Sequence, residues 1–203
     1  MAGTAKTRTA LQAQIDADIN DNVLGEISPA DVRGVMEDTI ASVDYGSGWG
    51  FYVDSETAPA TQTFNATASK LQIDGAGGGN TSYLPREIRG VSDLWDTTND
   101  KILPVNLGDA YSIRIDMTVT GETQNPNNII LQLDIGGGAT PSIVIVDSYI
   151  STGKGTPYTL SVAFPIFCLS NFIINGGQLF ISTDAGAITV SSRAISIHRL
   201  STN

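Results

Sequence analysis

The stretch YSIRIDMTV, residues 111–119, decides the fold class of this chain. Its apolar and polar residues alternate at every position, with Tyr111, Ile113, Ile115, Met117 and Val119 separated by Ser112, Arg114, Asp116 and Thr118. A period of two is typical of a β-strand that has one buried face and one face in water. The stretch therefore predicts a half-buried strand of an antiparallel sheet.

Short strand patterns continue on both sides of this stretch. The predicted strands are Gly50–Asp54, Gln62–Asn65, Lys70–Asp74, Ile129–Ile135, Ser142–Ile150, Tyr158–Ile166, Asn171–Ile174, Gln178–Ser182, Ala187–Val190 and Ala194–Leu200. Gln132 and Asp134 are expected to point outward from their strand. The glycine runs at 75–79 and 136–138 favour hairpin turns or flexible tips. About ten short strands joined in this way predict an antiparallel β-sandwich, with a jelly roll as the preferred form.

The first 45 residues have a different chemistry. They contain none of the fourteen aromatic residues of the chain apart from Tyr45 at their end, and their apolar residues recur at helical spacing. The two apolar stripes consist of Leu11, Ile15 and Ile19, and of Val32, Val35, Met36, Ile40 and Val43. Ser28 followed by Pro29, with Asp31 close behind, is typical of a helix start. The sequence predicts two helices here, and after residue 45 no helical period apart from one turn at Ser92–Trp95.

Neither predicted helix exceeds about 15 residues, a length at which isolated helices are marginal in water. Their stripes must be buried against the sandwich, sister copies or another protein, and other chains are the preferred partner. We therefore expect residues 1–45 to be an anchoring segment and 46–203 a jelly-roll domain, with a hinge at Gly46–Gly50. The predicted anchoring or oligomer interface consists of Leu11, Ile15, Ile19, Val32, Val35, Met36 and Ile40.

Composition narrows the range of partners. The formal net charge is −10, of which −5 falls in the first 45 residues. An acidic chain is poorly suited to a phosphate backbone, so nucleic-acid binding is not expected. The start lacks an apolar signal core and no apolar run approaches the ~20 residues that cross a bilayer, so we expect a soluble protein without membrane insertion. Cys168, the single cysteine, is expected to be a small buried hydrophobe.

Candidate catalytic and ligand-binding residues are few. His198 is the only histidine and is expected at a surface or interface, which leaves no histidine-based zinc site. Gly153–Gly155 lacks the spacing of a phosphate loop and favours a turn. Asp93, Asp96 and Asp100 could supply oxygen ligands to calcium, but their spacing favours turn-forming and capping roles. We expect no catalytic residue, no bound metal and no cofactor.

The aromatic residues of the second part leave a binding role open. Exposed rings can stack on sugars, and the candidates are Trp49, Tyr52, Tyr83, Trp95, Tyr149 and Tyr158. Of these, Trp95 and Tyr83 are the predicted glycan contacts, although a place at the core edge or between subunits is favoured for any single tyrosine. The residues expected in the core are Phe164, Phe167, Phe172 and Phe180.

Two parts of the chain resemble known proteins. The segment TALQAQIDADINDNVLGEISPADVRGVMEDTIASV, residues 9–43, resembles an N-terminal segment of tail-fibre-like and other structural proteins of tailed bacteriophages. The body is similar to the jelly-roll domain of phage particle proteins, which is itself like tumour-necrosis-factor-like trimers. The segments that carry this similarity are LQIDGAGGGNTSYLP (71–85), LWDTTNDKILPVNLGDAYSIRIDMTV (94–119), LQLDIGGG (131–138), FPIFCLSNFIINGG (164–177) and AISIHRLS (194–201). The resemblance implies a homotrimer attached to a virion and brings no catalytic residues.

These observations together predict a non-enzymatic virion protein that is assembled in the host cytoplasm. Its helices would anchor a trimer to capsid, portal, collar or tail proteins, and its jelly roll would stabilise the particle or contact the host. The alternative is a carbohydrate-binding module that recognises host surface glycans. An enzyme is not expected, because the single histidine and the lack of a metal motif leave few routes to catalysis.

Overall fold

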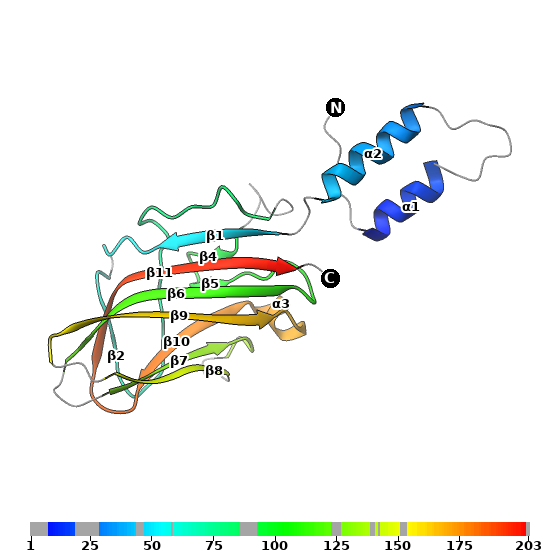
Figure 1. Cartoon of the computed structure of the whole chain (residues 1–203). Helices are drawn as coiled ribbons and strands as arrows, with labels where there is room; N and C mark the ends of the chain where they lie inside the picture. The colour runs from blue at the N-terminus through cyan, green and yellow to red at the C-terminus, as the bar shows by residue number, and fades with distance from the viewer. Residues whose placement is uncertain are drawn as a thin grey trace.

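The computed structural model describes residues 8–18, 29–43, 47–57, 59–85, 93–122, 127–138, 141, 143–150 and 154–201. In these ranges the chain forms a pair of short helices followed by a sandwich of antiparallel sheets (Figure 1). The prediction of a mainly β, jelly-roll sandwich preceded by a two-helix segment is confirmed.

The two helices are α1 (Arg8–Asp18) and α2 (Pro29–Val43). Helix α2 begins at Pro29, as predicted, because a proline at the first helical position loses no intrahelical hydrogen bond. Asp31 in its first turn lies near the positive end of the helix dipole. The helices pack against each other, and Figure 1 shows the pair set apart from the sandwich.

The sandwich has two sheets. Sheet A contains β1 (Gly48–Val53), β11 (Ile188–Ser201), β6 (Ala110–Gly121) and β9 (Pro157–Phe167) in that order, with β2 (Gln62–Phe64) also paired to β11. Sheet B contains β4 (Trp95–Asp96), β5 (Lys101–Ile102), β10 (Gly177–Thr183), β7 (Asn127–Asp134) and β8 (Ile143–Ile150), with β3 (Ser69–Lys70) paired to β10. The chain crosses between the sheets from β6 to β7, from β8 to β9, from β9 to β10 and from β10 to β11, as a jelly roll does.

Strand β6 is a central strand of sheet A. It contains the stretch whose alternation of apolar and polar residues predicted the fold. It pairs with β11 on one side and with β9 on the other. The side chains of Tyr111, Ile113 and Ile115 are fully buried between the sheets, whereas Arg114 is exposed. They pack with apolar residues of β7, β10 and β11, so the main core lies between the two sheets.

The free edge of β1 is covered by residues 77–83. Phe51 and Asn80 exchange backbone hydrogen bonds of 2.9 and 2.7 Å, and the Trp49 N–H donates to the Tyr83 carbonyl at 2.8 Å. A Cβ atom on Gly79 would lie 2.1 Å from the Phe51 carbonyl oxygen, so only glycine lets the chain come this close. The glycine run at 75–79 was expected to form a hairpin turn or flexible tip. It does form a turn, at residues 76–78, and Gly77 and Gly79 also lie against β1.

One predicted strand is a helix. Residues 171–174 belong to α3 (Ser170–Asn175), which ends where Gly176 takes a positive φ of 74°. The short apolar run fitted a buried strand, but such runs do not distinguish a strand from a buried helix. The helix places the buried Phe172 ring edge-on to Tyr111, with ring centroids 6.4 Å apart.

Other strand predictions shift in detail. Of residues 70–74 only Lys70 lies in a strand, and Trp95, expected in a helical turn, lies in β4. Strand β1 begins at Gly48, inside the predicted hinge. Phe167, expected in the core, is 66% exposed because its place opposite Ala110 turns it outward. Phe172 and Phe180 are buried as predicted, and Phe164 is partly buried.

The two strands predicted at 187–190 and 194–200 form the single strand β11. Its register shifts between Ser191 and Ala194, where Ser192 has a positive φ of 50°. An extra residue changes the side-chain alternation, so Val190, Arg193 and Ile195 can all be buried.

Two fully buried arginines of β11 are paired with aspartates. Arg199 places Nε 2.8 Å from Asp109 Oδ2 and donates from Nη2 to Oδ1 at 2.9 Å, and the Tyr111 hydroxyl donates to Oδ2 at 2.9 Å. Arg193 donates to Asp54 and, at 2.7 Å, to the carbonyl of Pro59. Each pair ties a loop to the last strand.

We expect Arg199→Met to lower the free energy of unfolding by about 3–5 kcal/mol, because Asp109 would be left as a buried charge without its partner. The matched control is Arg114→Met. Arg114 forms an exposed ion pair with Asp116, so its loss should cost about 1 kcal/mol or less. Urea unfolding monitored by tryptophan fluorescence measures both values. Equal small losses would show that the buried pair does not hold the loop.

Cys168 is fully buried, as predicted, and burial raises the pKa of its thiol to about 11, with the nearby Asp109 charge adding to the rise. The folded protein should therefore react negligibly with a disulfide reagent as the pH is raised from about 7 to 9, whereas the unfolded chain reacts through a thiol of pKa about 8.5. Absorbance of the released thiolate follows the reaction. A native rate that rises with a midpoint near that of the unfolded chain would contradict this.

Candidate functional site

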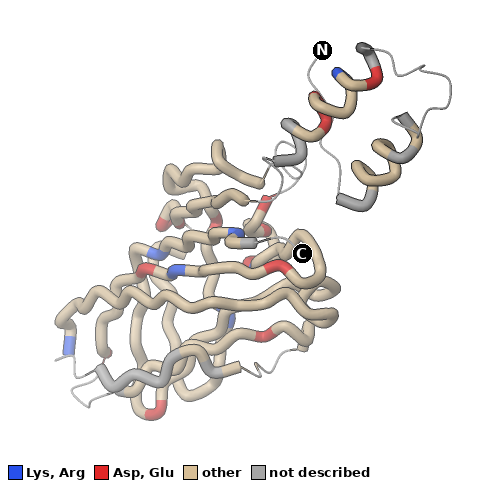
Figure 2. Tube along the Cα trace, turned by 45° about the vertical axis from the view of Figure 1, so that its right-hand side comes forward, with Lys and Arg blue, Asp and Glu red and all other residues tan. Residues whose placement is uncertain are grey.

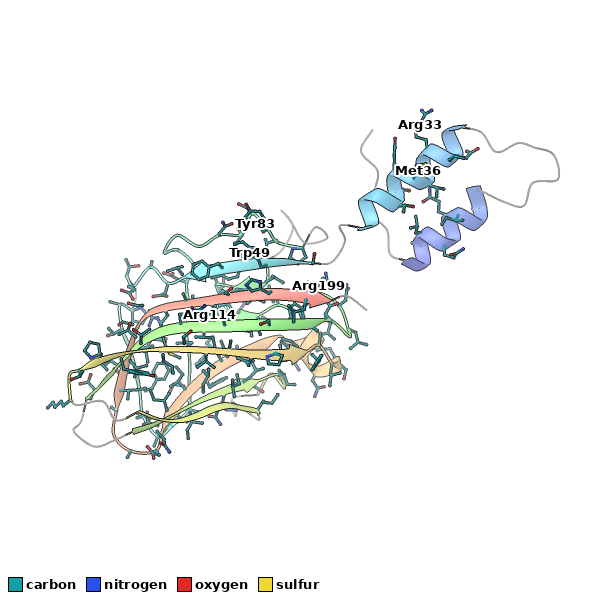
Figure 3. The ribbon with its side chains drawn as sticks, viewed as in Figure 1. Arg33, Met36, Trp49, Tyr83, Arg114 and Arg199 are labelled. Carbon is teal, nitrogen blue, oxygen red and sulfur yellow. The ribbon has the colours of Figure 1, made fainter. Side chains whose placement is uncertain are left out.

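Helix α2 presents apolar side chains that no neighbour covers within the described residues. Val35 is buried, while Val32 is 40% and Met36 is 58% exposed. Val32 and Met36 are four residues apart and share one face of the helix. Figure 3 shows Met36 and Arg33 on the side of α2 that is turned away from α1. We call Val32 and Met36 the helix strip.

The predicted anchoring residues thus divide into two groups. Leu11, Ile15 and Val35 are buried or half-buried, whereas the helix strip is open. Ile19 lies outside the described residues, and so does the side chain of Ile40. The spacing of the apolar residues indicated both groups but could not separate the one that holds the helices together from the one that is left open.

Three rings stack where β1 begins. The Trp49 ring lies between those of Tyr83 and His198, with centroids 5.1 and 5.9 Å away and an interplanar angle of 19° in both cases. Tyr83 is 56% exposed, and His198 is exposed as predicted and lies 2.9 Å from Ser196 Oγ through Nε2. Figure 3 shows Trp49 and Tyr83 close together at the β1 edge of the sandwich. We call Trp49, Tyr83 and His198 the ring stack.

The two predicted glycan contacts are in different environments. Trp95 is only 1% exposed, and its indole N–H donates to the Ile73 carbonyl at 2.8 Å. Its ring is therefore part of the core and offers no stacking surface, which corrects the prediction. Tyr83 has an exposed ring, and Trp49 stacks against it and holds it in place.

The outer face of sheet A carries little charge. Among the outward positions of β1, β11, β6 and β9, the ion pair is that of Arg114 with Asp116, at 2.9 Å. Ser161 of β9 donates to the same carboxylate at 2.6 Å. The remaining positions are small, hydroxyl-bearing, aliphatic or aromatic, with Leu200 among the exposed ones, and Figure 2 shows the strands mostly tan with single charged positions. Such a face resembles the sparsely charged centre of a protein–protein interface.

The aspartates around Trp95 organise turns. Asp96 accepts hydrogen bonds from the backbone of Thr98 and Asn99, both at 3.0 Å. Asp100 accepts from the Ile73 N–H at 3.0 Å and lies 3.3 Å from Lys70 Nζ. Turn-forming and capping roles were the preferred interpretation, which is confirmed for Asp96, whereas Asp100 holds a segment that is distant in the sequence. Across the described ranges, no three His, Cys, Asp or Glu side chains are grouped closely enough to hold a metal ion.

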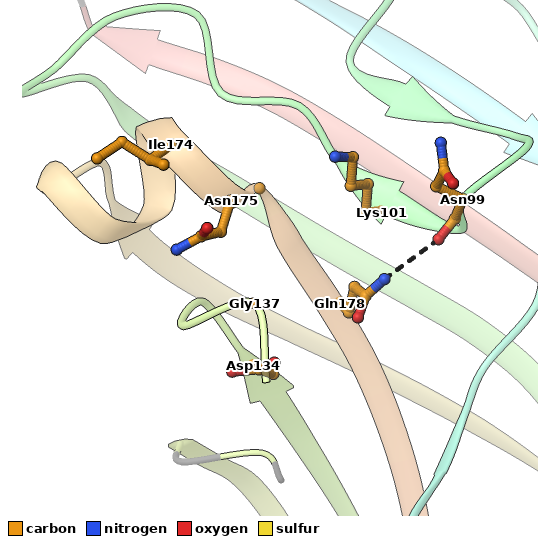
Figure 4. Close-up of a pocket in the computed structure, with 8 residues that line it drawn as sticks. Asn99, Lys101, Asp134, Gly137, Ile174, Asn175 and Gln178 are labelled. Atoms are coloured by element: carbon orange, nitrogen blue, oxygen red, sulfur yellow. Dashed lines mark hydrogen bonds between the residues drawn. The ribbon is translucent and has the colours of Figure 1, made fainter. Parts of the chain in front are cut away.

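A polar pocket of about 320 Å³ opens on the outer side of sheet B, below α3 (Figure 4). Its walls include Asn99, Lys101, Asp134, Ile174, Asn175 and Gln178. Asp134 was expected to point into water but is only 3% exposed, because α3 and the loop after β7 cover this end of the sheet. No pattern in the sequence indicated this pocket.

In the part of the chain that the structure describes, no helix is both long and apolar enough to cross a membrane.

Comparison with known proteins finds no matching family model and no matching curated protein. Among solved structures, the Eiger TNF of S. frugiperda is similar with a TM-score of 0.46 and 10% identity over 78% of this chain and 95% of that chain. The PRD1 vertex protein P5 gives 0.38 and 17%, over 78% and 74%. The C-terminal domain of EclA, a sugar-binding protein, gives 0.33 and 6%, over 47% and 63%. At such low TM-scores and identities, these likenesses assign no role to this chain.

Proposed function

We propose that the chain is a structural protein of a bacteriophage virion and acts without catalysis. In this proposal it forms a homotrimer whose helices attach to capsid, portal, collar or tail proteins. The jelly-roll body is displayed outward as a decoration, fibre or spike component, where it stabilises the particle or contacts the host.

The observation that carries this proposal is the open helix strip. Two helices of 11 and 15 residues are marginal on their own, and packing against each other still leaves Val32 and Met36 exposed. Burying both side chains against a partner would add about 1.5–3 kcal/mol for each copy. Several copies attached to one particle would then combine weak single contacts into firm attachment.

The outer face of sheet A supports the trimer. It is broad, sparsely charged and carries the half-buried Trp49 at its edge. Interfaces between copies of one protein are depleted of charge at their centre and enriched in aromatic residues. In this arrangement the helices contact the particle and the sandwich forms the contacts between copies. The two roles can therefore be tested separately.

A first experiment removes the helices. We expect the fragment 47–203 to keep the trimeric mass of the full chain in light scattering and to lose co-sedimentation with particles of the parent virus that lack this protein. The full chain carrying Val32→Asp and Met36→Asp should behave like the fragment, because charge opposes burial of the strip. Lys154→Ala, a change at an exposed residue of the sandwich away from the helices, is the control and should bind normally.

Antibody-labelled electron microscopy of intact particles would show where the protein sits. Normal particle binding by the double variant would contradict anchoring by the helices. A monomeric fragment would contradict the assignment of the trimer contact to the sandwich.

A second candidate function is favoured by the ring stack. The exposed ring of Tyr83, which is held from behind by Trp49, is the kind of platform on which the apolar face of a sugar can stack. In this alternative the chain is a carbohydrate-binding module for host surface glycans. We expect Tyr83→Ala to abolish glycan-array binding, whereas Tyr158→Ala, also an exposed tyrosine, leaves it unchanged. Equal binding by both variants would exclude the ring stack as the glycan site.

A further inference from the structure

The polar pocket below α3 is built on a row of side chains that three strands bring together. In sheet B, Lys101 of β5 lies opposite Gln178 of β10, and Gln178 lies opposite Asp134 of β7. Their chain neighbours Ile102, Leu179 and Leu133 are buried in the core. The three polar side chains therefore stand on the outer face of the sheet, side by side across the strands.

The walls of the pocket are held in place by hydrogen bonds. Asn175 at the end of α3 donates from Nδ2 to the Ile135 carbonyl at 3.2 Å, which ties the helix to the end of β7. Gln178 donates from Nε2 to the Asn99 carbonyl at 3.4 Å, the bond drawn in Figure 4. A Cβ atom on Gly176 would lie 2.7 Å from the Ile102 carbonyl oxygen and 3.1 Å from Lys101 Cδ. The strand, the helix end and the lysine stem are thus tightly packed around the opening.

Within the described ranges, one of the two carboxylate oxygens of Asp134 has no hydrogen-bond donor beside it. Its Oδ1 accepts from the Gly136 N–H at 2.9 Å. Its Oδ2 is buried and has no hydrogen-bond partner among the residues that the structure describes. A buried carboxylate oxygen that lacks a donor costs free energy, because it has lost water and gained nothing in exchange. Asp134 is one of the residues that line the pocket, so a small movement of its side chain would bring this oxygen within reach of a hydroxyl group bound there.

The chemistry of the walls selects the class of ligand. Asp134 and the amide oxygens of Asn99 and Asn175 accept hydrogen bonds, while the Lys101 ammonium and the Gln178 amide donate them. Neighbouring hydroxyls of a sugar ring need both kinds of partner, since each hydroxyl donates one hydrogen bond and accepts others. One lysine and one aspartate give the pocket no net charge, which favours a neutral ligand over a phosphate or a free cation.

Size and surface agree with this chemistry. A volume of about 320 Å³ is at the lower end of the range for small-molecule sites, so the pocket suits one ring rather than a chain of rings. Ile174 is 76% exposed at the rim and offers an apolar contact for the C–H face of a ring. We infer that this pocket binds a single pyranose unit of a glycan, through Asp134, Lys101 and Gln178. The site is on the sheet opposite the ring stack and does not depend on the trimer.

The test uses the full chain and a panel of neutral hexoses and N-acetylhexosamines, first by saturation-transfer NMR and then by calorimetry on any sugar that binds. Lys101→Met keeps the length of the stem and removes the ammonium, and Asp134→Asn keeps the shape and removes the charge. Each should weaken the affinity by about tenfold to a hundredfold, as expected for hydrogen bonds to charged groups. Lys154→Met, a change at an exposed lysine in a turn, is the control and should leave the affinity unchanged.

Each outcome either assigns sugar binding to the pocket or excludes the pocket. Loss of binding in Lys101→Met with full binding in Tyr83→Ala supports the pocket. Binding that depends on Tyr83 and not on Lys101 overturns it in favour of the ring stack. Failure of every sugar in the panel to bind, or binding of inorganic phosphate or calcium alone, also overturns it. The circular dichroism of each variant confirms that the fold is kept, and Lys101→Met decides the result if Asp134→Asn does not fold.

Discussion

The sandwich depends on two arginines of its last strand that are buried without access to water. A guanidinium cannot lose its charge in a protein, so each buried arginine needs a carboxylate beside it. Arg199 forms an ion pair with Asp109 in the loop before β6, and Arg193 forms one with Asp54, the residue that follows β1. Because strand β11 carries both arginines and pairs with β1, β2 and β6, it fixes the places of segments that are far apart in the sequence. The β-bulge that turns Arg193 inward is therefore part of the architecture.

The periodicity of apolar residues correctly predicted elements that bury one face. The alternation in residues 111–119 and the helical spacing around Val35 both appear as expected, because each reports burial of one face of a single element. Periodicity fails where a second layer covers the outer side of a sheet. Asp134 has the alternation of an outward residue and is still buried, since α3 and the loop after β7 lie over it. The burial of Trp95 is likewise not predicted by periodicity, because its two-residue strand is too short to show any period.

The polar pocket below α3 could not be predicted from the sequence. Lys101, Asp134 and Gln178 come from three strands that are widely separated in the chain, and only the register of sheet B aligns them. No local signal links such residues without knowledge of the pairing. The helix strip was closer to prediction, because Val32 and Met36 belong to one helix and their spacing places them on one face. What the spacing could not show is which stripe the neighbouring helix occupies.

The segment 77–83 that covers the edge of β1 limits how copies of the chain can associate with one another. A free strand edge can recruit a strand from another molecule, and repeated recruitment leads to fibres. With Phe51 bonded to Asn80, the β1 edge of sheet A is already satisfied by the chain itself. Neighbouring copies of the chain would then meet through side chains at this edge rather than through backbone amides. The glycines allow Phe51 and residues 77–79 to approach closely, and this approach opposes aggregation through the β1 edge.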